Sequence, residues 1–184
     1  MRSTSAIRSQ ALRLLSEAKI DKPSVPVEKL ALSLGARVRC EPFSMQALSG
    51  ALIRQRDTVV IGVNSRHSEA RRRFTVAHEL GHLVLRHQGA SIHIDQVMMY
   101  VSMRDSISSK AIDPNEIEAN RFAAELLMPE PFLREDIGRA TRHGVVDMLD
   151  DDFIRKLATR YKVSIQAMAI RLENLGFASL AAAR

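Results

Sequence analysis

Residues 74–85 read FTVAHELGHLVL, an apolar segment interrupted by three titratable side chains, His78, Glu79 and His82. Successive residues of an α-helix are about 100° apart, so two histidines four positions apart lie on one face, a turn from each other. Burying His, Glu and His together without a ligand would cost free energy. The segment therefore predicts a buried helix over residues 68–87 that presents two imidazoles to one common ligand.

This spacing predicts a zinc site. Neutral imidazole nitrogens bind zinc at about 2.0–2.1 Å, and Glu79 would lie beside the open coordination position rather than on the metal. Zinc lowers the pKa of bound water toward about 7, so Glu79 would accept a proton as the water attacks a peptide carbonyl and then pass it to the leaving amine. The alternative is a surface helix with incidental His and Glu, which fits the apolar surroundings poorly. Gly81 weakens a helix interior by about 1 kcal/mol, which indicates that another element packs closely there.

The third ligand is expected from a later helix. A catalytic zinc normally has three protein ligands, and Pro114 opens a helical segment, EIEANRFAAELLMP, that carries two acids, Glu116 and Glu118. Asn120 lies four residues after Glu116, on the same face, where its amide would hydrogen-bond a ligating histidine or the carboxylate. We expect Glu116 to bind the metal, with Glu118 as the alternative and Asn120 as a supporting residue.

Two further side chains have less certain roles. His87 lies five residues beyond His82 and is expected to pack or hydrogen-bond at the helix end rather than to bind metal. Tyr100 belongs to the long irregular stretch 88–114, which could cover the cleft, and its hydroxyl could stabilise an oxyanion. Packing in the core or within this stretch is the alternative that we favour for Tyr100.

The remaining pattern predicts an α+β fold. Two helices are expected before residue 36, the second opened by Pro26 and ended by Gly35. Three strands follow, ARVRCEP, SGALIR and TVVIGVN, with Arg56-Asp57 in a hairpin turn. We expect a small, mostly antiparallel sheet packed on helices, including the helix of the histidines. The third strand could offer an edge to which an extended substrate segment adds, although the pattern does not show which strand edge is free.

The last part of the chain predicts a helical pair, capped by Asp150–Asp152 and by Ser164, whereas Pro129 and Pro131 are expected to end the preceding helix. The pair has the short turn of a helix-turn-helix, with Gln166 and Arg171 as candidates for reading bases. Apolar positions dominate, so a structural role is favoured. We divide the chain into a metallopeptidase domain, 1–130, and a helical extension, 131–184, packed on it as a single structural unit.

Composition limits the partners and the location. The net charge of +6 would suit nucleic acid or an acidic partner, but the positive residues are scattered. The single Cys40 cannot form an internal disulfide, and the beginning of the chain lacks the apolar core of a secretory signal. No segment approaches the roughly 18–20 apolar residues of a membrane-spanning helix. We expect a cytoplasmic protein with no membrane partner.

Three blocks in the same order, NSRHSEARRRFTVAHELGHLVLRH, RDSISS and EIEANRFAAELLMP, resemble the ImmA/IrrE-type zinc metallopeptidases. The resemblance covers residues 20–130 and extends more loosely through LATRYKVSIQAMAIRLENLG. It implies a zincin-like domain of the gluzincin type, in which the third ligand is a glutamate followed four positions later by a polar residue, as Glu116 and Asn120 are. It also implies cleavage of a helix-turn-helix repressor encoded nearby, which would release genes of mobile elements or stress responses.

A different class of function stays open at this point. The chain could be a DNA-binding or repressor-binding module with a structural or vestigial metal site, which the basic charge and the C-terminal helical pair motivate. It could also be one partner of a toxin–antitoxin pair. Salt-dependent binding to duplex DNA without proteolysis would favour the binding module. Direct contact with nucleic acid is the less expected outcome.

Overall fold

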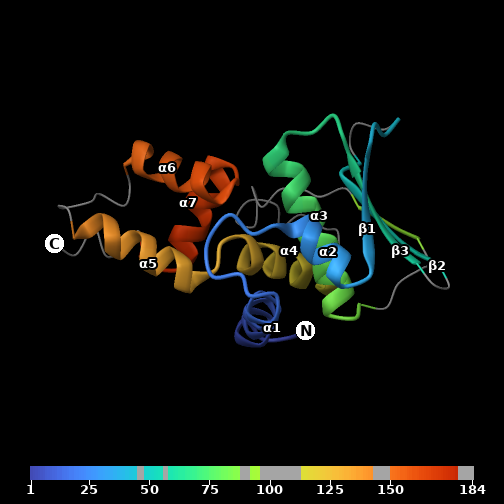
Figure 1. The fold of residues 1–184 in the computed structure, drawn as a ribbon, viewed down its shortest axis with the longest axis horizontal. Coiled ribbons are helices and arrows are strands. Elements are labelled where there is room, and N and C mark those ends of the chain that lie inside the picture. Colours follow the sequence, from blue (N-terminus) through green and yellow to red (C-terminus); the bar gives the residue numbers. More distant parts are fainter. Residues whose placement is uncertain (45–47, 56–57, 88–91, 96–112, 143–149, 178–184) are drawn as a thin grey trace.

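The computed structural model describes residues 1–44, 48–55, 58–87, 92–95, 113–142 and 150–177. Within these residues seven helices and a four-stranded sheet form an α+β fold, as predicted (Figure 1). The helices are α1 (Thr4–Glu17), α2 (Val27–Ser33), α3 (Glu69–Val84), α4 (Pro114–Leu127), α5 (Glu130–Thr141), α6 (Asp151–Tyr161) and α7 (Ile165–Asn174). The strands are β1 (Ala36–Glu41), β2 (Gly50–Gln55), β3 (Thr58–Asn64) and β4 (Ile92–Asp95).

Five of the described helices begin at residues whose side chains satisfy free backbone N–H groups, whereas α2 and α5 begin after a proline without such a cap. Ser68 caps α3 by accepting from the N–H of Arg71, and Asp113 caps α4. Asp150 and Ser164 cap α6 and α7, as predicted. Among the described helices none is both long and apolar enough to cross a membrane.

The sheet has the strand order β1-β3-β2-β4 and is mixed. Strands β2 and β3 form the expected antiparallel hairpin, and β4 pairs antiparallel with β2. Strand β1 instead runs parallel to β3, from Ala36 opposite Val59 to Glu41 opposite Asn64. Strand β3 is therefore an interior strand, and the hypothesis that it offers a free edge was wrong. Alternation of residues identifies strands but not their neighbours. The predicted turn at Arg56-Asp57 lies outside the described residues.

One helix was not anticipated. Pro129 and Pro131 do follow the end of α4, but α5 begins at once, at Glu130. Proline is tolerated in the first turn of a helix, where its missing N–H would have no intrahelical partner. A proline pair can therefore start a helix as well as end one, and the sequence prediction considered only the ending.

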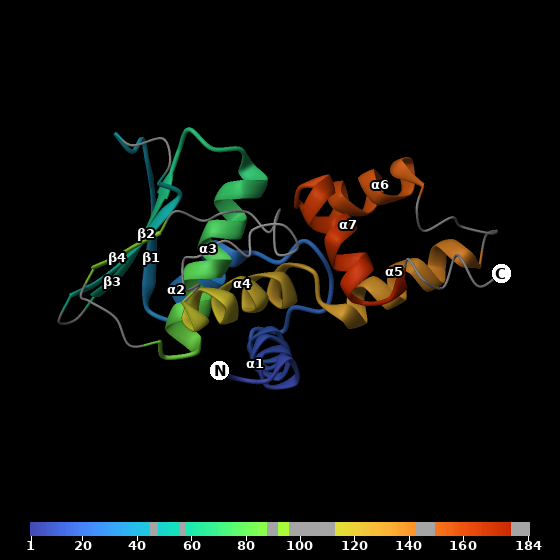
Figure 2. The ribbon, with the colours of Figure 1, turned by 180° about the vertical axis from the view of Figure 1, so that it is seen from behind.

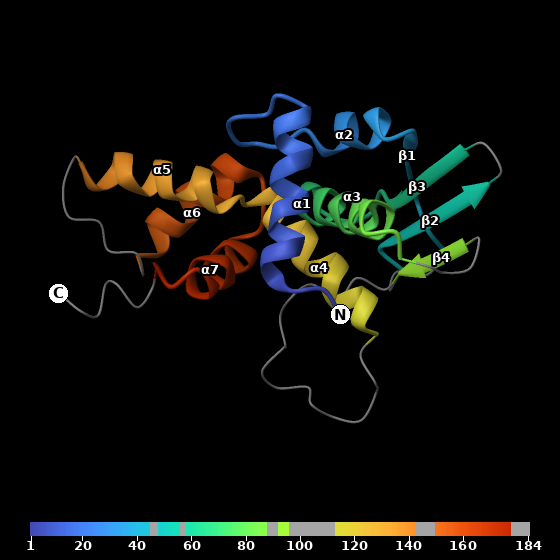
Figure 3. The ribbon, with the colours of Figure 1, turned by 90° about the horizontal axis from the view of Figure 1, so that it is seen from below.

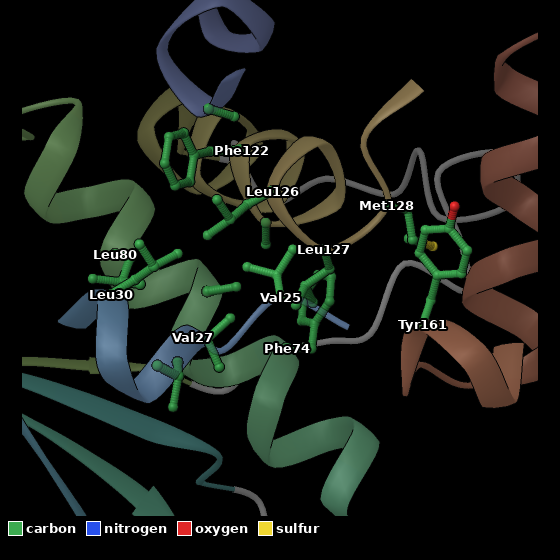
Figure 4. Close-up of a cluster of buried hydrophobic side chains, with 14 of the residues drawn as sticks. Val25, Val27, Leu30, Phe74, Leu80, Phe122, Leu126, Leu127, Met128 and Tyr161 are labelled. Carbon is green, nitrogen blue, oxygen red and sulfur yellow. The ribbon is translucent and has the colours of Figure 1, made fainter. Parts of the chain in front are cut away.

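Helix α3 lies at the centre of the molecule. It contacts β2 and β3 of the sheet on one side and α4 on the other, and α1 packs on α4. Helices α5, α6 and α7 lie on the side away from the sheet (Figures 2 and 3). Buried apolar side chains join these layers, among them Leu80 of α3 with Phe122 and Leu126 of α4 (Figure 4).

Helix α3 approaches α4 closely at Gly81. A β-carbon at this position would lie 3.0 Å from Cα and 3.1 Å from the carbonyl oxygen of Ala119. The expectation that another element packs closely against Gly81 is therefore confirmed. A side chain at this position would therefore require the two helices that carry the candidate site to move apart by a few tenths of an ångström.

Candidate metal centre

Helices α3 and α4 bring three potential ligand atoms together. Nε2 of His78 and Nε2 of His82 are 3.0 Å apart. Glu116, in the first turn of α4, places Oε2 3.2 Å from the His78 nitrogen and Oε1 3.3 Å from the His82 nitrogen. The two histidines are buried, while the Glu116 side chain is 24% exposed. Of the three residues, Glu116 is therefore the most exposed.

The size of this triangle fits a small divalent ion. Two ligands bonded at about 2.0–2.1 Å with tetrahedral angles are separated by about 3.3 Å. The two histidine nitrogens are 3.0 Å apart, and each has one oxygen of the Glu116 carboxylate at a comparable distance, 3.2 Å from Oε2 and 3.3 Å from Oε1. With one ligand atom from each residue, the three atoms lie within 4.8 Å of one another. Two imidazoles and a carboxylate are a donor set used by catalytic zinc. His78, His82 and Glu116 therefore suit a metal ion in both chemistry and spacing.

Glu79 lies in the most enclosed part of the site. Its side chain is fully buried, and α3 holds it against the beginning of β2. A β-carbon added at Gly50 would lie 3.0 Å from Oε1 of Glu79 and would overlap a methyl group of Thr75. Gly50 therefore makes room for the carboxylate beside the sheet. The packing of α3 against β2 therefore fixes the position of the Glu79 carboxylate.

The two histidines have different supports. Nδ1 of His78 is 3.0 Å from Oδ1 of Asn120, which places Asn120 where the sequence predicted it. Nδ1 of His82 is 3.1 Å from Nδ1 of His87, and Nε2 of His87 is 3.1 Å from Oε2 of Glu118. Both ring nitrogens of His87 are thus engaged away from the ligand triangle, in agreement with the hydrogen-bonding role expected for it.

Charges around this second support are strongly coupled. Burial would raise the pKa of Glu118, but hydrogen bonds from the backbone N–H and guanidinium of Arg2, and from His87, lower the pKa to about 2. Burial lowers the pKa of His87, and the neighbouring Glu118 carboxylate offsets part of this effect. Glu118 is therefore an anion at neutral pH, and it pairs with Arg2 from the beginning of the chain.

The structure separates the residues that the sequence left as alternatives. Glu116 faces both histidines, whereas Glu118 turns toward His87 and Arg2. Tyr100 lies outside the described residues. Arg171, considered as a base-reading residue, is buried in a two-bond ion pair with Glu125, with distances of 2.9 and 2.6 Å. It supports the packing of α7 on α4 instead.

Sequence reasoning missed Arg2 and Gly50 as parts of the surroundings of the site. Arg2 is 116 residues from Glu118, and no local pattern links two such positions. Gly50 begins a strand and carries no chemical group. Its closeness to Glu79 could be predicted only by knowing that β2 packs against α3.

Comparison with known proteins supports a peptidase. The sequence model of the family described as IrrE N-terminal-like domain, Peptidase_M78, matches residues 31–173. The match spans the whole of α3 and α4, and so contains all three residues of the ligand triangle. No curated protein matches the chain.

Proposed function

The chain belongs to the IrrE N-terminal-like peptidase family, and on this premise we propose that it is a zinc-dependent endopeptidase that cleaves a regulatory protein, a helix-turn-helix repressor. The observation that carries the proposal is the ligand triangle of His78, His82 and Glu116 with the buried Glu79 beside it. Its spacing supports zinc as the metal, because tetrahedral coordination needs separations of about 3.3 Å.

A bound zinc ion would lower the pKa of a water molecule toward about 7 and polarise the peptide carbonyl. Glu79 acts as the general base in this proposal: it takes a proton from the attacking water and later delivers it to the leaving amine. Its burial between α3 and the beginning of β2 supports this role, because it fixes the position of the carboxylate within the site. His78, His82 and Glu116 provide the metal ligands, and Asn120 orients His78.

The substrate assignment rests on the resemblance to ImmA/IrrE-type peptidases and on the basic charge of the chain. A net charge of +6 would attract a partner with an acidic surface. Arg171, one of the two α7 residues considered for base contact, is buried and donates two hydrogen bonds to Glu125. It is therefore not available to contact DNA. This observation favours a protein over DNA as the partner.

The test uses the purified protein, stoichiometric zinc and the helix-turn-helix regulator encoded beside it, with cleavage products identified by mass spectrometry. We expect one or a few cuts in the regulator. Glu79→Gln should retain zinc and abolish cleavage, because the amide cannot accept the proton. Glu69→Gln is the matched control: it lies in the same helix, exposed and paired with Lys162, and should change neither property.

Two outcomes would contradict the proposal. If Glu79→Gln cleaves the regulator at the wild-type rate, Glu79 is not the base. If the wild-type protein leaves the regulator intact but binds duplex DNA with strong salt dependence, the chain is a binding module of the kind considered above.

A further inference from the structure

Helix α3 ends in a tight turn that contains Arg86 and His87. Arg86 has left-handed backbone geometry, with φ 53°. The N–H groups of Arg86 and His87 donate to the carbonyls of Leu83 and His82, at 3.2 and 3.0 Å. These are the two hydrogen bonds of a Schellman motif. The turn brings the His87 ring edge-on against His82, with ring centroids 4.9 Å apart.

The hydrogen-bond directions follow once His82 uses Nε2 as a ligand. Its Nδ1 must then carry the hydrogen, which it donates to Nδ1 of His87 across 3.1 Å. With Nδ1 of His87 accepting, the hydrogen of that ring is on Nε2, which donates to Oε2 of Glu118 across 3.1 Å. Every donor thus meets an acceptor, and the series ends on a carboxylate.

His87 and Glu118, at the end of this series of hydrogen bonds, are buried, and Glu118 is held by Arg2. The side chains of His87 and Glu118 are each 3% exposed. Arg2 donates to Glu118 from its backbone N–H and, at 2.6 Å, from Nη1. Nη2 of Arg2 donates to the carbonyl of Leu85 at the end of α3, at 2.5 Å. Arg2 therefore ties the carboxylate on α4 to the turn that carries His87.

We propose that His87 and Glu118, with Arg2 behind them, are positioning residues that hold the imidazole of His82 in its Nδ1–H tautomer and aim Nε2 at the metal. The inference rests on the proposed function, since it assumes that His82 is a ligand. Metal-binding histidines usually donate their second N–H to a carboxylate or carbonyl, and removing that partner costs about 10–100-fold in metal affinity. Here a second imidazole stands between the ligand and the carboxylate.

The test measures zinc affinity of the full chain by competition with a chelator, which needs no substrate. His87→Phe keeps the volume of the ring but removes the acceptor, and should weaken zinc binding about 10–100-fold. His87→Gln, which still offers an acceptor and a donor, should lose less. Glu118→Gln should also weaken zinc binding, because a neutral amide holds the His87 hydrogen less strongly.

Glu125→Gln is the matched control for Glu118→Gln. Both acids are on α4, both are buried, and both are paired with arginine, but Glu125 faces Arg171 instead of the site. The control should lose stability and keep its zinc affinity. As a second readout, the Nδ1–H proton of His82 in the zinc-loaded protein should be slow to exchange in NMR spectra, and should exchange rapidly in His87→Phe.

The outcomes separate the two levels of inference. If the wild-type chain does not bind one zinc ion, the proposed function itself fails. If the wild type binds zinc and both His87→Phe and Glu118→Gln bind it with wild-type affinity, the positioning role is overturned. Equal losses of stability in Glu118→Gln and Glu125→Gln, with zinc affinity unchanged in both, would reduce Glu118 to a structural residue.

Discussion

Gly81→Ala should weaken the metal site without touching any ligand. The added β-carbon would lie 3.0 Å from Cα and 3.1 Å from the carbonyl oxygen of Ala119, and 3.3 Å from Cβ of Phe122. Ordinary contacts between carbon atoms are about 3.5–4.0 Å, so α4 must move away from α3 by a few tenths of an ångström. The obstacle is backbone, which cannot rotate aside as a long side chain could.

Two free energies oppose each other in this substitution. Alanine is about 1 kcal/mol more favourable than glycine in a helix interior. Overpacking a filled contact costs about 1–3 kcal/mol. We therefore expect Gly81→Ala to be less stable than the wild type by about 1 kcal/mol in urea denaturation of the metal-free protein.

Gly81→Ala should also lower the affinity of the site for zinc. Ala119 lies one turn after Glu116, so a shift of α4 carries the Glu116 carboxylate away from the two histidines. Metal sites tolerate deviations of only about 0.2 Å in ligand distance. We expect zinc affinity, measured by chelator competition, to fall at least about tenfold, which corresponds to about 1.4 kcal/mol.

Gly138→Ala supplies the control. Gly138 is inside α5, and a β-carbon there would meet nothing within 4 Å. This variant should gain about 0.5–1 kcal/mol of stability and bind zinc as the wild type does. If Gly81→Ala proves as stable as Gly138→Ala and keeps full zinc affinity, the α3–α4 contact does not set the geometry of the site.

Three further substitutions test other parts of the molecule. Gly50→Ala should cost about 1–3 kcal/mol in urea denaturation and reduce cleavage more than zinc binding, since its β-carbon would lie 3.0 Å from Oε1 of Glu79. Arg171→Met should destabilise the protein by about 3 kcal/mol, because the buried Glu125 carboxylate loses two hydrogen bonds and keeps Arg8 as its ion-pair partner, and adding Glu125→Leu should recover part of this loss. Burial opposes ionisation of Glu130, but neighbouring arginines lower its pKa below 4.5. Its contribution is therefore present above pH 4.5 and lost as pH falls through the lowered pKa, so acid denaturation curves of Glu130→Gln and wild type should converge at low pH.

Local spacing was sufficient to predict the elements of the site. Within one helix the pitch fixes which residues share a face, so His78 and His82 had to lie together, as did Glu116 and Asn120. Capping side chains predicted where α6 and α7 begin, whereas the beginning of α5 has no such cap. These are short-range effects, and the printed sequence contains all the information that they need.

Contacts between distant segments could not be predicted in the same way. The parallel pairing of β1 with β3 depends on which strand edge remains open after the β2–β3 hairpin has formed. The partners of Glu118 and Glu125 are 116 and 46 residues away, and any of the many arginines could have paired with them. Opposite charge selects a kind of partner, but only the packing of helices selects the residue.

The acids of α4 explain how such long-range pairs can serve the site. Glu118 and Glu125 are seven residues apart and share one face, and they pair with Arg2 and Arg8 from the beginning of the chain. Glu116 points about 200° away from Glu118, toward the histidines. A rotation of α4 by one residue, about 100°, would bury unpaired carboxylates, which is costly even though each formed pair adds little net stability. We infer that the ion pairs fix the rotation of α4 about its own axis, and that this rotation decides which of the two neighbouring glutamates faces the metal.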